Sequence, residues 1–450
     1  MEQPAPLPGP RPELVHRRPS QLRPGETPIG WAVTANPSVG FAPRKPNERT
    51  RAADRRLIAY RGDGHFVTIA RTGAGKGRSC TIPWLLTMPN PAIVLDVKGE
   101  AFHTTAAYRR DELGHRIVVV DPFGKVGGGD RLNPFDLIRP DRIEEDADVL
   151  AELFLEARAT TLPDPFWDNL ARSLVLGVIA HLAATHERPT PRALRDFLQA
   201  EDVPYQMAVL LDQKQVTNPL ANREFMTFLN HEKDKVRPSV LSTAQQHLRT
   251  LASEKALRSV CDSTISLDDV VAGRDFTIYL VIPPENLASH GQLLRLWVGT
   301  LLHAVTRRTR RPPLNTLFVL DEIAQCGTLP ILRQAMTLLR GYSMTTMTLW
   351  QDLSQMQRLY PDWQTLLNNS AVVQTFGASN FGMAQTLGGV LGVAPERVRD
   401  LQADRSLVSV CGAEPFEVDR MDYLRDQFLK RRSSPNPWFD GGPEDEGPTR

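Results

Sequence analysis

The chain has 450 residues, with 41% hydrophobic and 23% charged side chains and a formal net charge of +1. This length exceeds one typical core and predicts two compact units with flexible ends. The net charge excludes an overall basic field, so any contact with nucleic acid must come from local clusters of Lys and Arg. The four cysteines lie far apart, which excludes a close-spaced zinc motif or a disulfide framework and favours a reducing compartment.

The first 56 residues are rich in proline and arginine and contain few core-forming residues. We predict a disordered basic arm over 1–56, which serves either as a solvated linker or as a docking arm for phosphate groups. The arm shows no signal-peptide pattern. The most apolar long stretch, 170–184, carries Arg172 and His181 and is too short to span a bilayer. We therefore expect no transmembrane segment, and a location in the cytoplasm or peripherally at the inner face of the cell membrane.

Short apolar runs, mostly β-branched or aromatic, recur along the chain and are apolar on both faces, as in a parallel sheet covered by helices. They predict strands at 65–70, 92–97, 116–121, 276–282, 316–320, 344–350 and 372–376. No such run occurs between 141 and 265, where the pattern predicts successive helices. We thus expect an α/β domain in two parts, 57–140 and 266–432, an all-α insertion domain at 141–265, and a disordered tail at 433–450.

A glycine-rich turn follows the first of these strands and precedes an expected helix. Its small residues would let backbone N–H groups close around phosphate oxygens, while Lys76 reaches the β and γ phosphates. The usual first glycine is Ala70 here, and Gly77 stands where a Ser or Thr usually binds Mg²⁺. Taken alone, the turn is equally compatible with close packing of a helix on a sheet. The expected nucleotide-binding residues are Arg71, Thr72, Gly73, Ala74, Gly75, Lys76, Gly77 and Arg78.

Two acids, Asp321 and Glu322, end the apolar strand predicted at 316–320. The carboxyl ends of parallel strands are where ligands bind in open α/β sheets. Asp321 is expected to orient Mg²⁺ and its waters, and Glu322 to polarise the attacking water as general base. Magnesium would be held through water, by a nearby hydroxyl such as Ser79, or mainly by Asp321. ATP and Mg²⁺ are the expected cofactors, and the alternative is that the acids merely end a strand.

Gln351 follows the strand predicted at 344–350, so it should emerge beside the strand end that carries Asp321. Its amide would sense the γ-phosphate or position the attacking water, or else form an ordinary surface hydrogen bond. Arg340 lies on the helix expected before this strand. It either stabilises transition-state charge in a neighbouring subunit or is an ordinary arginine at a helix end.

Two further groups remain open at this stage. The acids and lysine of 96–100 either face the nucleotide or only close a turn. The densest basic run of the folded region is either a solvated loop or a contact for DNA phosphates. The ten histidines show no metal-ligand spacing with acids or cysteines, so Mg²⁺ is the only metal expected. The basic run consists of Arg307, Arg308, Arg310 and Arg311.

Several ordered segments together resemble the TraG/TraD-type coupling proteins of conjugation and type IV secretion. The resemblance implies a RecA/FtsK-like P-loop NTPase, usually a hexamer around a DNA channel, with an all-α domain that recognises the relaxosome or substrate. By matching position it supports Lys76, Asp321, Glu322, Gln351 and Arg340 as site residues. The segments are 64–77, 93–100, 120–123, 132–137, 278–284, 320–324, 329–332, 339–342, 351–355, 368–369 and 374–377.

The chain departs from this family at its start, where the Pro/Arg-rich arm stands in place of the usual transmembrane helices. We therefore expect a soluble form without the anchor, which depends on type IV secretion channel proteins or a separate membrane anchor. The leading hypothesis is a DNA-stimulated ATPase that couples DNA or relaxase–DNA to the channel as a homo-oligomer. The alternatives are a nucleotide-switched adaptor that recruits relaxase or effector proteins, and another FtsK/HerA-like DNA-processing ATPase.

Overall fold

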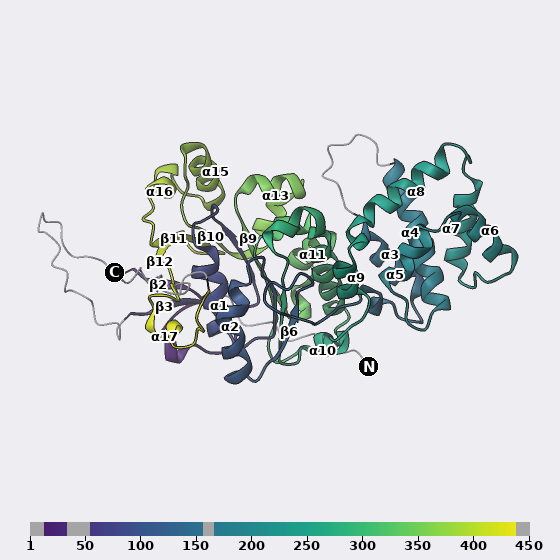
Figure 1. The fold of residues 1–450 in the computed structure, drawn as a ribbon. Coiled ribbons are helices and arrows are strands. Elements are labelled where there is room, and N and C mark those ends of the chain that lie inside the picture. Colours follow the sequence, from purple (N-terminus) through teal and green to yellow (C-terminus); the bar gives the residue numbers. More distant parts are fainter. Residues whose placement is uncertain (1–12, 34–54, 156–165, 438–450) are drawn as a thin grey trace, which may run out of the picture.

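A computed structural model describes residues 13–33, 55–155 and 166–437 of the chain (Figure 1). One twelve-stranded sheet runs through the described residues, in the order β1-β3-β2-β12-β11-β10-β4-β9-β8-β5-β7-β6. The strands from β10 to β6 in this order are parallel, whereas those from β1 to β11 pair antiparallel. The bounds are β1 Glu13–Arg17, β2 Glu26–Ala32, β3 Leu57–Arg61, β4 His65–Ile69, β5 Ala92–Leu95, β6 Arg116–Val120, β7 Phe276–Leu280, β8 Thr316–Leu320, β9 Met344–Trp350, β10 Ser370–Thr375, β11 Arg405–Val410 and β12 Phe416–Asp419.

The parallel half of the sheet consists of the strands expected from the apolar runs. Along these strands, alternate side chains enter two different cores. Ile93 and Phe318 pack in the core that contains α11, whereas Val94 and Val319 pack in the core that contains α1 and α2. Because both faces are covered, the runs show no polar alternation. The predicted α/β class with a mostly parallel sheet is confirmed.

Helices cover the sheet and build a separate helical part of the chain (Figure 1). Within 141–265 the described residues form helices and no strands, and α4 contacts α3, α7 and α8 there. The bounds are α1 Ile82–Thr87, α2 Glu100–Asp111, α3 Ile143–Phe154, α4 Phe166–Thr185, α5 Pro191–Leu198, α6 Val203–Asp212, α7 Pro219–Asn230, α8 Val236–His247, α9 Glu254–Val260, α10 Leu267–Ala272, α11 Pro284–Val305, α12 Pro330–Thr337, α13 Leu353–Leu359, α14 Trp363–Asn368, α15 Phe381–Leu391, α16 Pro395–Arg399 and α17 Gln427–Lys430.

The N-terminal segment corrects the expectation of a disordered arm over 1–56. Residues 13–33 form β1 and β2, and β2 joins the sheet by pairing with both β3 and β12. Ile29 and Trp31 are buried in the core behind this part of the sheet, and that burial offsets the cost of ordering the chain. The sequence does not indicate these strands, because prolines and arginines outnumber the apolar residues over 1–56. The rest of the predicted arm, 1–12 and 34–54, lies outside the described residues.

The C-terminal segment corrects the start of the predicted disordered tail. Asn436 is fully buried, and its amide donates a 2.7 Å hydrogen bond to the hydroxyl of Tyr423. The backbone N–H of Ser434 also donates to the carbonyl of Thr104 on α2. Order therefore extends beyond 433, while 438–450 lie outside the described residues. Among the helices that the structure describes, none has the length and apolarity needed to cross a membrane.

Candidate active site

The glycine-rich turn leaves β4 near the middle of the sheet, between β10 and β9. Gly73 and Gly75 have φ values of +77° and +85°, a region that side chains rarely adopt. The N–H of Ala74 donates to the carbonyl of Arg71 at 3.1 Å and closes the turn. A single π-helical turn, η2 (Gly77–Thr81), follows and leads directly into α1. The turn thus presents its N–H groups at the start of a helix, as phosphate binding requires.

Lys76 lies inside this turn, with only 6% of its surface exposed. Its Nζ donates to the carbonyl of Ala70 at 2.7 Å and approaches the carbonyl of Arg71 at 3.5 Å. Both acceptors are neutral, so the positive charge of the ammonium group is not cancelled by a hydrogen-bonded acid. A phosphate oxygen entering the turn would gain a charge-assisted hydrogen bond from Lys76.

Asp321 and Glu322 follow β8 at the same edge of the sheet. Glu322 has a φ of +55°, a left-handed conformation that is uncommon outside glycine and is often found at functional sites. Its Oε2 accepts a 2.7 Å hydrogen bond from Nε2 of Gln351, which follows β9. The structure therefore brings Gln351 to Glu322, in the arrangement that parallel strand ends predict.

Asp321 lies close to the turn and to α2. A Cβ atom placed on Gly77 would stand 3.9 Å from Oδ2 of Asp321 and 3.7 Å from Oε2 of Glu100. Burial and then the charge of Glu322 raise the pKa of Asp321 to about 6, and burial also raises the pKa of Glu100. Asp96 closes the turn before α2, because its Oδ2 accepts from the N–H of Phe102 at 2.8 Å. The segment 96–100 therefore both closes a turn and places an acid beside the loop.

The acids beside the loop fit Mg²⁺, which prefers carboxylate oxygens. A divalent cation next to Asp321 and Glu100 would offset the cost of keeping these charges out of water. Among the residues that the structure describes, no group of three or more His, Cys, Asp and Glu side chains could hold a metal. Mg²⁺ would therefore be held by Asp321, water and nucleotide phosphates together.

Substitution of Gly77 by serine is expected to lower the Mg²⁺ concentration needed for nucleotide binding. The new hydroxyl would add an oxygen beside Asp321, at a position where the glycine backbone is not left-handed. Asp321→Ala should raise the requirement. Binding of a fluorescent ATP analogue, titrated with Mg²⁺, measures both effects. Gly129→Ser, at an exposed glycine with open space around it, is the matched control. A Mg²⁺ titration unchanged in Asp321→Ala would contradict the assignment.

Arg340 lies in the short 3-10 helix η6 (Leu339–Tyr342), directly before β9. The end of η6 is held by Arg308, whose guanidinium donates to the carbonyls of Tyr342 and Ser343 at 3.0 and 2.7 Å. Ser343 is left-handed, with a φ of +55°. The backbone that carries Arg340 is therefore fixed from inside the domain.

The structure corrects the expectation for part of the basic run at 307–311, because Arg308 is buried and Arg307 is partly buried. Arg308 is 7% exposed and hydrogen-bonds to four backbone carbonyls and to the hydroxyl of Thr316. Burial lowers its pKa to about 10. Arg307 donates to the carbonyl of Leu137 and approaches Asp146. Arg308 therefore fits neither a solvated loop nor a DNA contact, because carbonyls and a hydroxyl of the protein take up its donors. Arg307 is partly buried and pairs within the protein.

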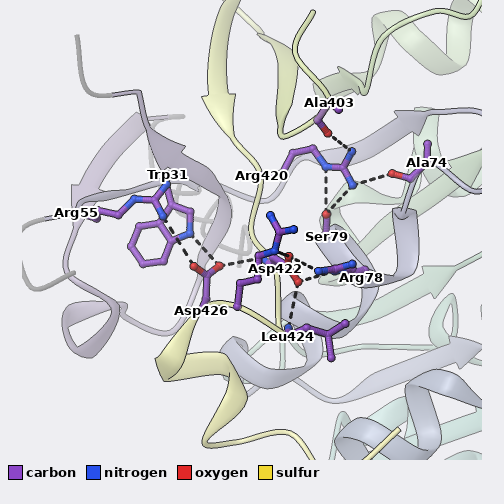
Figure 2. Close-up of polar contacts among 11 residues, drawn as sticks. Trp31, Arg55, Ala74, Arg78, Ser79, Ala403, Arg420, Asp422, Leu424 and Asp426 are labelled. Atoms are coloured by element: carbon purple, nitrogen blue, oxygen red, sulfur yellow. Dashed lines mark hydrogen bonds and ion pairs between the residues drawn. The ribbon is translucent and has the colours of Figure 1, made fainter. Parts of the chain in front are cut away.

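Arg420, directly after β12, is a residue of the site that the sequence did not indicate (Figure 2). Its Nη2 donates to the carbonyl of Ala74 at 2.7 Å, inside the glycine-rich turn. Its Nε and Nη2 also donate to Oγ of Ser79 at 3.2 and 3.0 Å. Ser79 therefore pairs with a cation, which argues against this hydroxyl as a Mg²⁺ ligand. The contact joins segments far apart in sequence, and no local pattern announces it.

Arg78 forms an ion pair with a second residue of the C-terminal segment, Asp422. Nε and Nη2 of Arg78 each donate to one oxygen of this carboxylate at 2.5 Å (Figure 2). This contact raises the pKa of Arg78. The expected nucleotide-binding residue Arg78 thus lies at the loop, with its charge already paired.

Two clefts flank the glycine-rich turn. One, of about 580 Å³, is lined by Arg71 and Thr72 together with Gln351 and residues of α13 and α15. The other, of about 500 Å³, lies between the turn and the C-terminal segment around Arg420. Both volumes are in the range of small-molecule sites, roughly 300–1,000 Å³. The turn therefore separates a cleft beside Gln351 from a cleft beside Arg78.

Solved structures share this fold. The chain superposes on the bacterial conjugative coupling protein TrwBdeltaN70, in its unbound monoclinic form, with a TM-score of 0.65 and 16% identity over 79% of this chain and 84% of that one. TrwB in complex with the ATP analogue ADPNP gives a TM-score of 0.63 and 15% identity, over 79% and 85% of the two chains. At these identities the likeness shows the fold, and it supports the predicted RecA/FtsK-like architecture.

Curated relatives lead to the same family. The conjugal transfer protein TraG of Escherichia coli is 23% identical over 416 residues, 87% of this chain and 65% of the relative. The type IV secretion system-coupling protein VirD4 of Bartonella quintana is 22% identical over 410 residues, 88% of this chain and 61% of the relative. The chain thus spans less than two thirds of these relatives. The family model described as type IV secretory system conjugative DNA transfer matches residues 41–394. The resemblance noted in the sequence is confirmed, and the chain belongs to this conjugative DNA transfer family of type IV secretion.

Proposed function

We propose that this chain is an ATPase that drives DNA, or relaxase bound to DNA, into a type IV secretion channel. The observation that carries the proposal is the meeting of Lys76, Asp321, Glu322 and Gln351 at one edge of the parallel sheet. Relatives support it by name, since they are coupling and conjugal transfer proteins. TrwB has been solved with ATP and GTP analogues and with ADP and Mg²⁺.

Each residue has a distinct role in the proposed hydrolysis. The N–H groups of the turn and the Lys76 ammonium would hold the phosphates and oppose their charge. Glu322 would take a proton from the attacking water, and Gln351, hydrogen-bonded to it, would orient the carboxylate. Bound Mg²⁺ supplies charge neutralisation on the phosphates, with Asp321 as its protein partner. The Glu322–Gln351 pair favours turnover over an adaptor that only binds nucleotide.

The partners follow from the family and are part of the proposal. We infer that active subunits assemble, as a hexamer around DNA, and that Arg340 acts on the nucleotide of a neighbouring subunit. A guanidinium there would stabilise charge on the transferring phosphoryl group. We place the working protein at the cytoplasmic face of the membrane, beside the channel proteins, because ATP is available there.

DNA-stimulated ATP hydrolysis by the purified chain tests this function. With Arg340 acting between subunits, the rate per subunit should rise with protein concentration, and DNA that gathers subunits should raise it further. The measurement is a steady-state ATPase assay over a range of protein concentrations, with and without single- and double-stranded DNA. A rate per subunit that is independent of both concentration and DNA would remove the proposed assembly and the role of Arg340.

A further inference from the structure

The cleft beside Arg78 lies between the phosphate loop and the C-terminal segment. Its lining includes Gly75 and Arg78 from the loop side, and Phe376, Asp404 and Arg420 from the opposite side. Figure 2 shows Arg420 reaching across to Ala74 and Ser79, with Arg78 and Asp422 beside them. The cleft thus opens directly against the first turn of the helix that follows the loop.

The two ends of the loop are chemically different, and this fixes the direction of a bound nucleotide. Glu322 and Gln351 stand at one end, where the attacking water and the γ-phosphate must meet. Lys76 and the N–H groups of the turn hold the phosphates between the ends. The nucleoside must then leave at the other end, beside Arg78. This step rests on the proposed function, and it places base and ribose in the cleft of Arg420.

Arg420 presents a flat, fixed surface in that cleft. Its guanidinium carbon lies 4.1 Å from the centre of the Phe376 ring. Hydrogen bonds to the carbonyls of Ala74 and Ala403 and to the hydroxyl of Ser79 hold the group in place. These three acceptors are neutral groups, and one face of the guanidinium rests on the aromatic ring of Phe376. Such a plane is suited to stack on a second aromatic system.

We infer that Arg420 binds the purine base of the nucleotide. One face of its guanidinium would stack on the base, and the other face lies on the ring of Phe376. The fixed plane lowers the entropy cost of the stack, because the side chain is already ordered before the ligand arrives. The same guanidinium is hydrogen-bonded to Ala74 of the loop and to Ser79 in the helical turn that follows it. One side chain would therefore both bind the base and stabilise the conformation of the loop. A purine offers a larger stacking surface than a pyrimidine.

The test compares ATP with inorganic tripolyphosphate, which carries the phosphates without the base. Calorimetric titration of the full chain with each of the two ligands, in the presence of Mg²⁺, measures both affinities. Arg420→Lys keeps a charged donor near Ala74 and removes the plane, so ATP affinity should fall roughly tenfold more than tripolyphosphate affinity. Phe376→Leu should shift ATP affinity in the same direction by less. Arg405→Ala is the matched control, because Arg405 pairs with Glu417 on the same hairpin.

The outcomes separate this inference from the proposed function. An equal loss of ATP and tripolyphosphate affinity in Arg420→Lys would overturn the inference and leave Arg420 as a brace of the loop. A wild-type chain that binds tripolyphosphate as tightly as ATP would overturn it as well, with the phosphate site intact. Unchanged ATP affinity in both Arg420→Lys and Phe376→Leu would also overturn the inference. If the wild-type chain bound neither ATP nor tripolyphosphate, the result would instead contradict the proposed function.

Discussion

Lys76→Ala is expected to abolish detectable ATP hydrolysis and to weaken nucleotide binding. The Lys76 ammonium is buried in the turn and hydrogen-bonded to neutral carbonyls, so its charge is available to the phosphates. Loss of one such electrostatic group typically costs about a hundredfold or more in rate. Steady-state hydrolysis and titration with a fluorescent ATP analogue measure the two effects.

The control for this variant is Lys255→Ala, since Lys255 is exposed on α9 in the helical part of the chain. It should retain both nucleotide binding and hydrolysis. Hydrolysis by Lys76→Ala at the wild-type rate would place the phosphates elsewhere, and the glycine-rich turn would then only pack a helix on the sheet.

Glu322→Gln should keep nucleotide binding and lose hydrolysis by about a hundredfold or more. The amide has nearly the shape of the carboxylate, so it can remain in contact with Gln351, but it cannot accept a proton from water. Single-turnover hydrolysis, measured beside equilibrium binding of ATP, separates the two functions. Glu285→Gln, at an exposed acid at the start of α11, is the control.

A binding defect as large as the defect in hydrolysis would contradict this division of roles, because Glu322 would then belong to the phosphate cradle. Undiminished hydrolysis in Glu322→Gln would remove Glu322 as general base. In that case the left-handed backbone at Glu322 would have to serve the turn after β8 alone.

The sequence predicted the parts of the fold whose cause is local. Strands such as β5 and β8 are buried on both faces, so each is a continuous apolar run that can be recognised without a partner. The chemical groups at their ends are adjacent in sequence to these runs. Parallel strand ends meet at one edge, so the sequence places Gln351 beside the strand end that carries Asp321, where its amide contacts Glu322.

The missed features depend on distant pairing. β2 contains a proline and a glycine, and its burial depends on pairing with β3 and with β12, which lies at the other end of the chain. Arg420 carries no local signal, because its meaning lies in contacts with Ala74, Ser79 and Phe376. Arg308 is similar, since a cluster of arginines looks solvated until buried carbonyls are found to take up its donors. Sequence periodicity indicates local burial only, so it cannot predict these contacts between residues that are far apart in the sequence.

We propose that the residues at the carboxyl ends of the parallel strands hydrolyse ATP and that this hydrolysis drives the movement of DNA. The most direct measurement is the steady-state ATPase rate of the full chain with and without DNA, for the wild type and for Glu322→Gln. The wild type should hydrolyse ATP faster when DNA is added, and Glu322→Gln should remain inactive under both conditions while still binding ATP. A wild-type rate that DNA leaves unchanged, or DNA-stimulated hydrolysis that survives in Glu322→Gln, would contradict the claim.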